Sequence, residues 1–184
     1  MGLAIAEELS RRGAAVTLVL GPSTLTVPSN ISLVKVTSAQ EMFDACTAVF
    51  KDIDVAVMSA AVADYAPVDV AESKIKKSGD SLIIAFKKTK DILKHLGSVK
   101  TQDQLLVGFA LETNNEKAYA IKKLDEKNAD MIVLNSLKDE GAGFGHDTNK
   151  IAIFDKKGGE HLFEMKSKKE VAIDIVNTII QFKK

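Results

Sequence analysis

The sequence predicts an α/β fold built on a doubly wound, mostly parallel sheet, and three observations support this prediction. Segments with helical periodicity alternate with short apolar segments along most of the 184 residues. The apolar segments AVTLVL, VAVMSA and MIVLN carry no charge, as is typical of strands covered on both faces. Near the end, KIAIFDKKGGEHLFEM has the pattern of an antiparallel hairpin around Lys157, Gly158 and Gly159. Together they indicate a Rossmann-like domain with an antiparallel C-terminal hairpin.

The helices and strands are expected in a regular order along one domain, residues 1–184. The chain opens on a helical pattern with Gly13 as its C-cap. Helices are expected at 2–13, 38–50, 90–97, 116–127 and 168–182, and strands at 15–20, 32–36, 53–59, 105–110 and 130–134. The first helix of an α/β domain normally follows a strand and a phosphate-binding turn. We therefore expect this chain to lack its first strand and glycine-rich loop, with Met1 an internal methionine.

One insertion, KIKKSGDSLIIAFKKT, breaks the alternation and predicts a projecting hairpin arm that turns at Ser78, Gly79 and Asp80. In its second strand, Leu82, Ile84 and Phe86 alternate with Ile83 and Ala85, so that both faces require burial. Packing on its own domain and a contact with a second copy both remain open.

Composition restricts the classes of function. Lys plus Arg and Asp plus Glu are equal at 25 each, so no global charge indicates a nucleic-acid or membrane partner. A single cysteine excludes a disulfide framework, and with three scattered histidines it makes a zinc site unfavourable. The sequence has no apolar run of about 18 residues and no signal-peptide pattern. These features favour a cytoplasmic location.

In open α/β sheets, ligands bind beyond the carboxyl ends of the strands, which directs attention to the loops at 59–74, 87–92, 110–116 and 135–149. Asp64 offers an acceptor there, although a helix cap or a turn explains an aspartate equally well. Lys74 and Lys76 would share one face of the arm and Lys77 the other, so the three cannot serve one ligand. A solvated face is the usual meaning of such a run.

Two further patterns are compatible with an anionic ligand. In KKTKDIL, Thr89 is expected to cap a helix that begins with Lys90 and Asp91, and free N–H groups at such an end hold phosphates. Lys123 and Lys127 are four residues apart on a predicted helix, where like charges repel unless an anion lies between them. An exposed charged face remains the alternative for the two lysines.

Aromatic and imidazole side chains give weaker signals. Phe109 fits either a core position or stacking on a base, and core is the commoner role. His95, His146 and His161 have no spacing typical of metal ligands, and we assign them no chemistry.

Part of the sequence resembles short-chain dehydrogenases, which bind NAD(P). GLAIAEELSRRGAAVTLVLG is similar to their first helix and second strand, and Tyr119 and Lys123 form Y-x-x-x-K. Gly21 and Pro22, however, stand where a cofactor-selecting residue is expected, and Leu105 to Gly108 occupy the region of the catalytic serine. A nucleotide-binding module without catalysis is a second alternative.

A second resemblance covers most of the chain. MGLAIAEELSRRGAAVTLVLGP, SAAVADYAPVDVAESKIKK, VGFALETNN and KLDEKNADMIVLN resemble, in order and spacing, the phosphopantothenate–cysteine ligase domain of coenzyme A biosynthesis. The resemblance implies a ligase that joins 4′-phosphopantothenate to cysteine with CTP and Mg²⁺, through an acyl-cytidylate, releasing pyrophosphate and CMP. It also implies a homodimer, for which the arm at Leu82 to Phe86 is our candidate contact. In bacteria this domain is often fused to a decarboxylase, and FMN would belong only to that partner domain.

The resemblance also assigns roles to residues. Lys74 would contact the nucleotide and support turnover, and the other nucleotide contacts would be Met58, Ser59, Ala60, Asp64, Lys90, Asp91, Ile92, Leu93, Phe109, Lys123 and Lys127. The family's K-N-P-D-I-L loop is altered at Thr89 and Lys90, and Ala66 replaces a common arginine. The family's I-S-N-x-S-S-G-K stretch would precede Met1. The sequence assigns no magnesium ligands.

Overall fold

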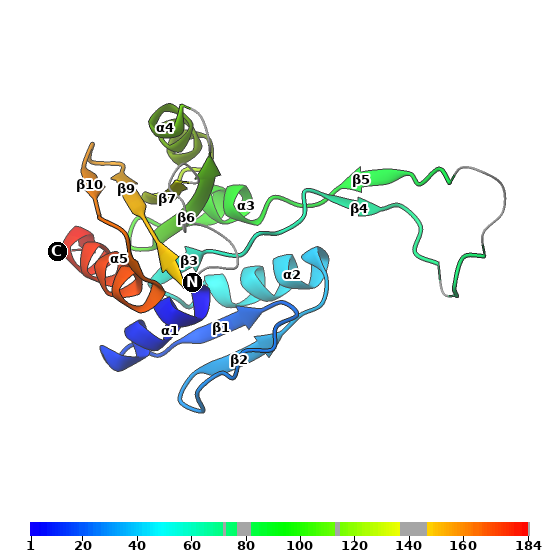
Figure 1. Ribbon diagram of the computed structural model, residues 1–184, viewed down its shortest axis with the longest axis horizontal. Coiled ribbons are helices and arrows are strands. Elements are labelled where there is room, and N and C mark those ends of the chain that lie inside the picture. Colours follow the sequence, from blue (N-terminus) through cyan, green and yellow to red (C-terminus); the bar gives the residue numbers. More distant parts are fainter. Residues whose placement is uncertain (72, 77–81, 113–114, 137–146, 184) are drawn as a thin grey trace.

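A five-stranded sheet forms the centre of the protein, whose computed structural model describes residues 1–71, 73–76, 82–112, 115–136 and 147–183 (Figure 1). The strand order is β10-β9-β7-β6-β3. The parallel strands are β3 (Val55–Met58), β6 (Leu105–Glu112) and β7 (Met131–Ser136). The hairpin of β9 (Ile151–Asp155) and β10 (Glu160–Leu162) is antiparallel to them. The prediction of a mostly parallel sheet with an antiparallel C-terminal hairpin is confirmed.

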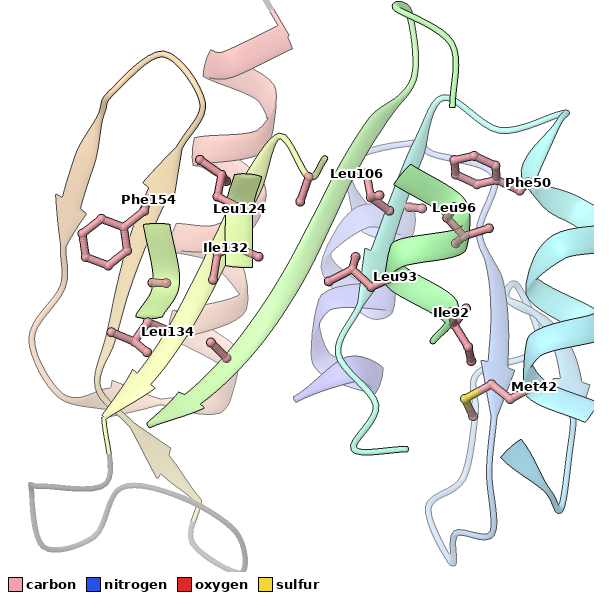
Figure 2. Packing of buried hydrophobic residues seen from close by; sticks show 14 of the residues in the cluster. Met42, Phe50, Ile92, Leu93, Leu96, Leu106, Leu124, Ile132, Leu134 and Phe154 are labelled. Atoms are coloured by element: carbon pink, nitrogen blue, oxygen red, sulfur yellow. The ribbon is translucent and has the colours of Figure 1, made fainter. Parts of the chain in front are cut away.

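Helices cover both faces of this sheet, as a doubly wound fold requires. The helices α1 (Gly2–Arg11) and α5 (Lys168–Lys183) pack on one face, where Leu105 and Val107 of β6 are buried. The helices α2 (Ala39–Phe50), α3 (Ile92–Val99) and α4 (Glu116–Glu126) share the second core. Figure 2 shows that core, to which β6 contributes Leu106. The side chains of β6 therefore alternate between two apolar layers.

Two parallel strands near the N-terminus form a separate sheet beside the five-stranded one. The strands β1 (Thr17–Leu20) and β2 (Ser32–Lys35) pair in parallel with each other. Among the described residues, β3 is hydrogen-bonded in a ladder only to β6, and β1 only to β2. The sequence predicts all of these strands for one sheet, whereas the structure has a gap in the ladder between β1 and β3.

The predicted arm projects from the body of the molecule (Figure 1), but its pairing differs from the prediction. Antiparallel pairing joins β4 (Tyr65–Pro67) to β5 (Phe86–Lys88) at the base of the arm. Thr89 N donates to Asp64 O at 2.9 Å, and Val68 N donates to Ala85 O at 2.9 Å. The predicted hairpin would pair its second strand with residues from Lys74 onward, whereas the structure pairs Phe86–Lys88 with Tyr65–Pro67, so this part of the prediction is wrong. The expected turn at 78–80 lies outside the described residues.

The observed end of α1 and the observed start of α3 differ from the predicted bounds. α1 ends at Arg11, and Gly13 follows with φ of 91°, the left-handed backbone for which glycine is suited. α3 begins at Ile92 with Asp91 as its N-cap, not Thr89. Thr89 instead donates its Oγ1 hydrogen to Ala63 O at 2.7 Å, which fixes the base of the arm.

The short strands β8 (Thr148–Asn149) and β11 (Lys166–Ser167) pair in an antiparallel way and were not predicted. Two residues are too few to show an alternating pattern. Within the described parts of the chain, no helix is both long and apolar enough to cross a membrane.

Candidate functional site

A groove of about 920 Å³ runs along β3 and opens at the carboxyl ends of β3 and β6. This is the edge at which open α/β sheets bind ligands, and the volume lies in the range of small-molecule sites. We call the part of the groove at this end the carboxyl-edge site. It is lined by Met58, Ser59, Ala60, Asp64, Thr89, Lys90, Asp91, Ile92, Leu93, Phe109, Lys123 and Lys127.

One wall of the site is the chain that leaves β3. Ser59 and Ala60 have small side chains, so a planar ligand can approach their backbone closely. Asp64 is exposed at the base of the arm, one residue before β4. Phe109 of β6 is half-buried beside this wall. This wall offers flat apolar surface next to one carboxylate.

The N-terminus of α3 forms a second wall. Asp91 caps the helix, since its Oδ1 accepts a hydrogen bond of 2.9 Å from Lys94 N. Its Oδ2 accepts a hydrogen bond of 2.6 Å from Lys127 Nζ. Burial opposes ionisation of Asp91, but the hydrogen bonds from Lys127 and Lys94 N and the charge of Lys123 together lower its pKa. An ionised carboxylate therefore occupies the positive end of α3.

The lysines of α4 and its C-cap complete the site. Lys123 Nζ donates to Phe109 O at 2.8 Å, and Lys127 Nζ reaches Asp91 across the groove. Lys123 and Lys127 therefore face one cavity, as predicted. The carbonyl of Phe109 and the carboxylate of Asp91 offset the repulsion between the two ammonium groups. Lys90 Nζ lies 4.4 Å above the centroid of the Phe43 ring, which places a third cation at the same end.

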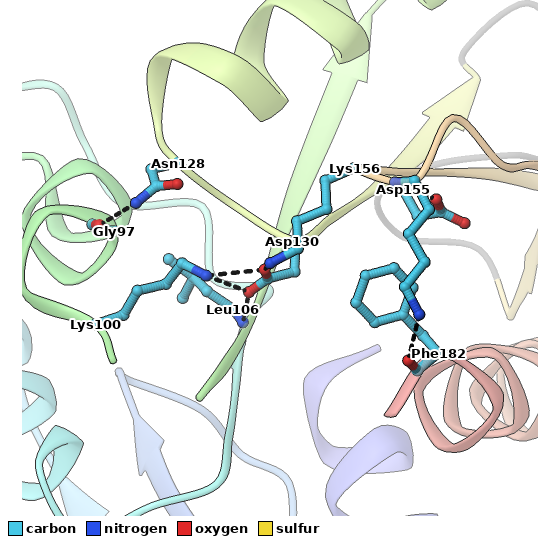
Figure 3. Close-up of polar contacts among 9 residues, drawn as sticks. Gly97, Lys100, Leu106, Asn128, Asp130, Asp155, Lys156 and Phe182 are labelled. Atoms are coloured by element: carbon cyan, nitrogen blue, oxygen red, sulfur yellow. Dashed lines mark hydrogen bonds and ion pairs between the residues drawn. The ribbon is translucent and has the colours of Figure 1, made fainter. Parts of the chain in front are cut away.

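Close packing between α3 and the end of α4 sets the distance between Asp91 and Lys127. A Cβ atom on Gly97 would lie 1.8 Å from Lys127 O, so only glycine allows this approach. Asn128 Nδ2 donates to Gly97 O at 2.7 Å, as Figure 3 shows, and its own φ of 48° turns the chain at the end of α4. The sequence analysis did not identify Gly97, although a glycine inside a helical pattern signals such contacts.

The structure brings together all of the predicted nucleotide contacts except Lys74. Ile92 and Leu93 are buried and contribute their side chains to the core, as Figure 2 shows. Lys74 is exposed on the arm and does not line the groove. Tyr119 is 48% exposed on α4 and does not line the groove either, which separates it from Lys123.

The charges of the site favour an anionic ligand with a polar, planar part. Three ammonium groups, those of Lys90, Lys123 and Lys127, are gathered with the carboxylates of Asp64 and Asp91. Among the described residues, no three His, Cys, Asp or Glu side chains lie together in a way that could hold a metal ion. The arrangement suits phosphate groups better than a metal bound by the protein alone.

Comparison with known proteins identifies the family. From residue 1 to residue 182 the chain matches the family described as the DNA/pantothenate metabolism flavoprotein C-terminal domain. The chain belongs to this family. The match covers every residue of the carboxyl-edge site.

Individual members of this flavoprotein C-terminal domain family are similar over almost the whole chain. A cysteine/cysteine sulfinic acid decarboxylase from an unknown prokaryotic organism is 50% identical over 98% of this chain and 50% of its own length. The coenzyme A biosynthesis bifunctional protein CoaBC of Haemophilus influenzae is 46% identical over 98% of this chain and 45% of its own length. The chain thus spans about half the length of these relatives.

A solved structure confirms the fold. The crystal structure of the C-terminal domain of CoaBC is 40% identical, with a TM-score of 0.82. The match covers 97% of this chain and 79% of that domain. The Rossmann-like fold predicted from the sequence is therefore confirmed.

Proposed function

We propose that this domain is a phosphopantothenate–cysteine ligase of coenzyme A biosynthesis and that the carboxyl-edge site binds CTP. One observation carries the proposal. An apolar wall and the ammonium groups of Lys123 and Lys127 line the same groove at one edge of the sheet. Membership of a family that includes CoaBC proteins supports it. We place the enzyme in the cytoplasm, on the sequence features given above.

The two parts of the site match the two parts of a nucleotide. The base and ribose fit along Met58 to Ala60 and Phe109, with Asp64 as an acceptor for their N–H or O–H groups. The phosphates fit beside Lys123, Lys127 and the start of α3, where ammonium and N–H donors converge. CTP is proposed over ATP from the family resemblance.

The proposed reaction has two steps. The carboxylate of 4′-phosphopantothenate attacks the α-phosphorus of CTP, forming an acyl-cytidylate and releasing pyrophosphate. The amine of cysteine then attacks the acyl carbon, which forms the amide, releases CMP and leaves one proton to solvent. Lys123 and Lys127 would stabilise the charge that develops on the phosphates. Mg²⁺ is expected to enter on the triphosphate, since Mg²⁺ commonly binds through substrate phosphates.

Lys74 and the arm belong to the same proposal. Apolar side chains along the arm are exposed, including Ile83 at 93% and Leu82 at 65%. Exposure of this kind is typical of an interaction surface, and we propose a homodimer formed through the arms. For Lys74 to meet a nucleotide, its arm has to approach a site of its own chain or of the second copy.

Calorimetry with CTP, ATP and NADPH tests the ligand. We expect CTP to bind more tightly than ATP, and the Asp64→Ala and Lys74→Ala variants to weaken CTP binding at least tenfold. Asp69→Ala and Lys76→Ala are matched controls on the arm, and they should bind CTP as the unchanged protein does. Binding of NADPH without binding of CTP would contradict the ligase assignment.

Turnover is tested on this chain joined to the part of a CoaBC relative that it does not span, by measuring pyrophosphate release with phosphopantothenate, cysteine and MgCTP. No release would refute the ligase, and release of carbon dioxide from cysteine without pyrophosphate would favour the decarboxylase chemistry named for one relative. Mixing the Lys74→Ala and Lys127→Ala variants shows whether the arm brings Lys74 to the site of its own chain or to the site of the second copy. Recovered activity in the mixture would mean that Lys74 serves the second copy.

A further inference from the structure

The three ammonium groups of the carboxyl-edge site differ in what holds them. Lys123 Nζ donates to a backbone carbonyl at 2.8 Å, and Lys127 Nζ donates to the Asp91 carboxylate at 2.6 Å. Lys90 Nζ has no carbonyl or carboxylate partner among the described residues, and its contact is with the face of the Phe43 ring, 4.4 Å from the centroid. Within the described chain, no hydrogen bond or ion pair therefore offsets the charge of Lys90.

The ring that holds Lys90 belongs to α2 and lies outside the groove. Phe43 is half-buried and packs against the core that α2, α3 and α4 share. On α3, the His95 ring lies 4.8 Å from the Phe43 ring, centroid to centroid, at an interplanar angle of 44°. Lys90 lines the groove, whereas Phe43 does not. The ring is thus fixed between two helices and supports the ammonium group from outside the groove.

Two other lysines lie over phenylalanine rings in the described parts of the chain, and each has a second anchor. Lys157 Nζ is 4.2 Å from the centroid of the Phe182 ring and also donates to Phe182 O at 3.0 Å. Lys166 Nζ is 5.8 Å from the centroid of the Phe163 ring and also donates to a carboxylate at 2.7 Å. Of the three lysines, only Lys90 lines the groove, and only Lys90 is held by a ring alone.

A ring is a suitable support for an ammonium group that has to bind an anion. The lysine side chain is flexible, and ordering it at the moment of binding reduces affinity. The face of a phenylalanine ring attracts a cation but carries no full negative charge, so it orders the side chain without neutralising it. The contact therefore preorganises a cation that a phosphate does not have to take from another anion.

Lys90 directly precedes the N-cap of α3, so its ammonium group and the helix start serve the same region. Asp91 Oδ1 accepts a hydrogen bond of 2.9 Å from Lys94 N. The N–H groups of Ile92 and Leu93, at the start of the helix, have no partner within it. The positive end of the helix favours an anion there. A phosphate at the start of α3 would thus meet these N–H groups together with the Lys90 ammonium group.

We propose that Phe43 is a positioning residue for phosphate recognition, because its ring holds the Lys90 ammonium group at the start of α3 for a phosphate of the bound nucleotide. The inference rests on the proposed function, which supplies CTP as the ligand. It assigns a role to a residue that does not line the groove and acts only through Lys90. An aromatic ring at position 43 should therefore be required, and apolar bulk alone should not suffice.

Calorimetry on three single variants and one double variant separates the ring from its bulk. Phe43→Leu removes the ring, Phe43→Tyr keeps it, and Lys90→Met removes the charge at similar length. We expect Phe43→Leu to weaken CTP binding about fivefold and Phe43→Tyr to stay within about twofold of the unchanged protein. Lys90→Met should weaken CTP binding about tenfold. In the Lys90→Met background, Phe43→Leu should add less than about twofold, because the ring then has no cation to hold.

A matched control and a second probe make the test specific. Phe182→Leu removes a ring that also lies beneath a lysine but outside the groove, and it should leave CTP binding unchanged. Inorganic tripolyphosphate has phosphates without a base or a ribose. We expect Phe43→Leu to weaken its binding by the same factor as that of CTP.

Three results would overturn the positioning role. Equal losses in Phe43→Leu and Phe43→Tyr, or a loss from Phe43→Leu that persists in full in the Lys90→Met background, would mean that the ring acts through packing. A loss seen with CTP and not with tripolyphosphate would mean that the ring serves the base.

Lys127→Ala distinguishes failure of this inference from failure of the proposed function. If Lys127→Ala weakens CTP binding while Phe43→Leu and Lys90→Met do not, only the positioning role is wrong. If the unchanged protein does not bind CTP, the proposed function is wrong, and the tripolyphosphate measurements still decide the role of Phe43.

Discussion

The two ends of the sheet both pair lysines with an aspartate, but they differ in burial. At the amino end, Asp130 is 1% exposed and accepts hydrogen bonds from Lys100 Nζ at 2.8 and 2.9 Å, from Leu106 N at 2.7 Å and from Lys156. Figure 3 shows this cluster. At the carboxyl end, Asp91 and Lys127 have side-chain exposures of 46% and 21%.

The difference separates a buried structural ion cluster from an ion pair that a ligand can reach. Lys100 is 7% exposed and Asp130 is enclosed by three donors, so a ligand has no access to these two charges, and only the third member, Lys156, is open to solvent, at 47%. Asp91 and Lys127 lie in the wall of a groove, and an anion from solvent can reach them. The same residue types therefore stabilise the fold at one end of the sheet and remain available to a ligand at the other.

The largest effect is expected from Asp130→Ala. Removal of this carboxylate leaves Lys100 buried without its counter-charge, which costs about 3–5 kcal/mol of folding free energy. Urea unfolding should show the loss, while CTP affinity of the folded protein should change less than twofold. If Asp130→Ala unfolds at the same urea concentration as the unchanged protein, the amino-end cluster is not structural.

Gly97→Ala should come next, because it disturbs the packing that serves the carboxyl end. The new Cβ would meet Lys127 O, and relief of this overlap should cost about 2–3 kcal/mol. Lys127 would shift with the chain, so CTP binding should weaken as well. Ser98→Ala is a control on the same helix, at an exposed position. An equal loss of stability in both variants would contradict the role of Gly97.

Lys127→Ala should change binding more than stability. We expect CTP affinity to fall about tenfold, on the order of 1.4 kcal/mol, because one ammonium group leaves the phosphate region. Lys122→Ala is the matched control, since Lys122 is 65% exposed and pairs with Glu126 at 3.7 Å, outside the groove. Calorimetry that finds equal losses for the two variants would remove Lys127 from the site.

Acid should reveal the smallest difference between the two ends. Burial opposes ionisation of Asp130, but the hydrogen bonds from Lys100, Lys156 and Leu106 N outweigh it, so its pKa is lowered. A lowered carboxyl pKa gives stability that is present above the ordinary pKa of aspartate, about 3.9, and is lost as pH falls through the folded value. Between pH 5 and about pH 3, the free energy of unfolding measured in urea should therefore fall more steeply with pH for the unchanged protein than for Asp130→Asn. Parallel curves would contradict this prediction.

Local patterns predicted the elements well, but not their pairing. Apolar runs marked β3, β6 and β7, and the glycines at 158 and 159 marked the terminal hairpin. The base of the arm was missed because pairing of Tyr65 with Lys88 depends on contacts 23 positions apart, as the register shows. Hydrophobic periodicity gives no information on such a register.

The same distinction holds for the site. Lys123 and Lys127 could be placed together, because four-residue spacing on a helix fixes their common face. The contact of Lys127 with Asp91 could not be predicted, since it depends on how α3 crosses the end of α4 at Gly97. Lys74 matched a family pattern, yet its position on the arm follows from tertiary structure that the pattern does not describe.

The N-cap of α3 has a consequence for the energetics of binding. Asp91 gives Lys127 an anionic partner in the absence of any ligand. A phosphate that binds Lys127 must compete with this carboxylate, so binding replaces one anion with another. The cap on Lys94 N uses the other oxygen of Asp91, so the helix can keep its cap during the exchange. The charges of Lys127 and Asp91 therefore balance each other before a phosphate binds, and the net gain from a phosphate at Lys127 is smaller than its charge alone suggests.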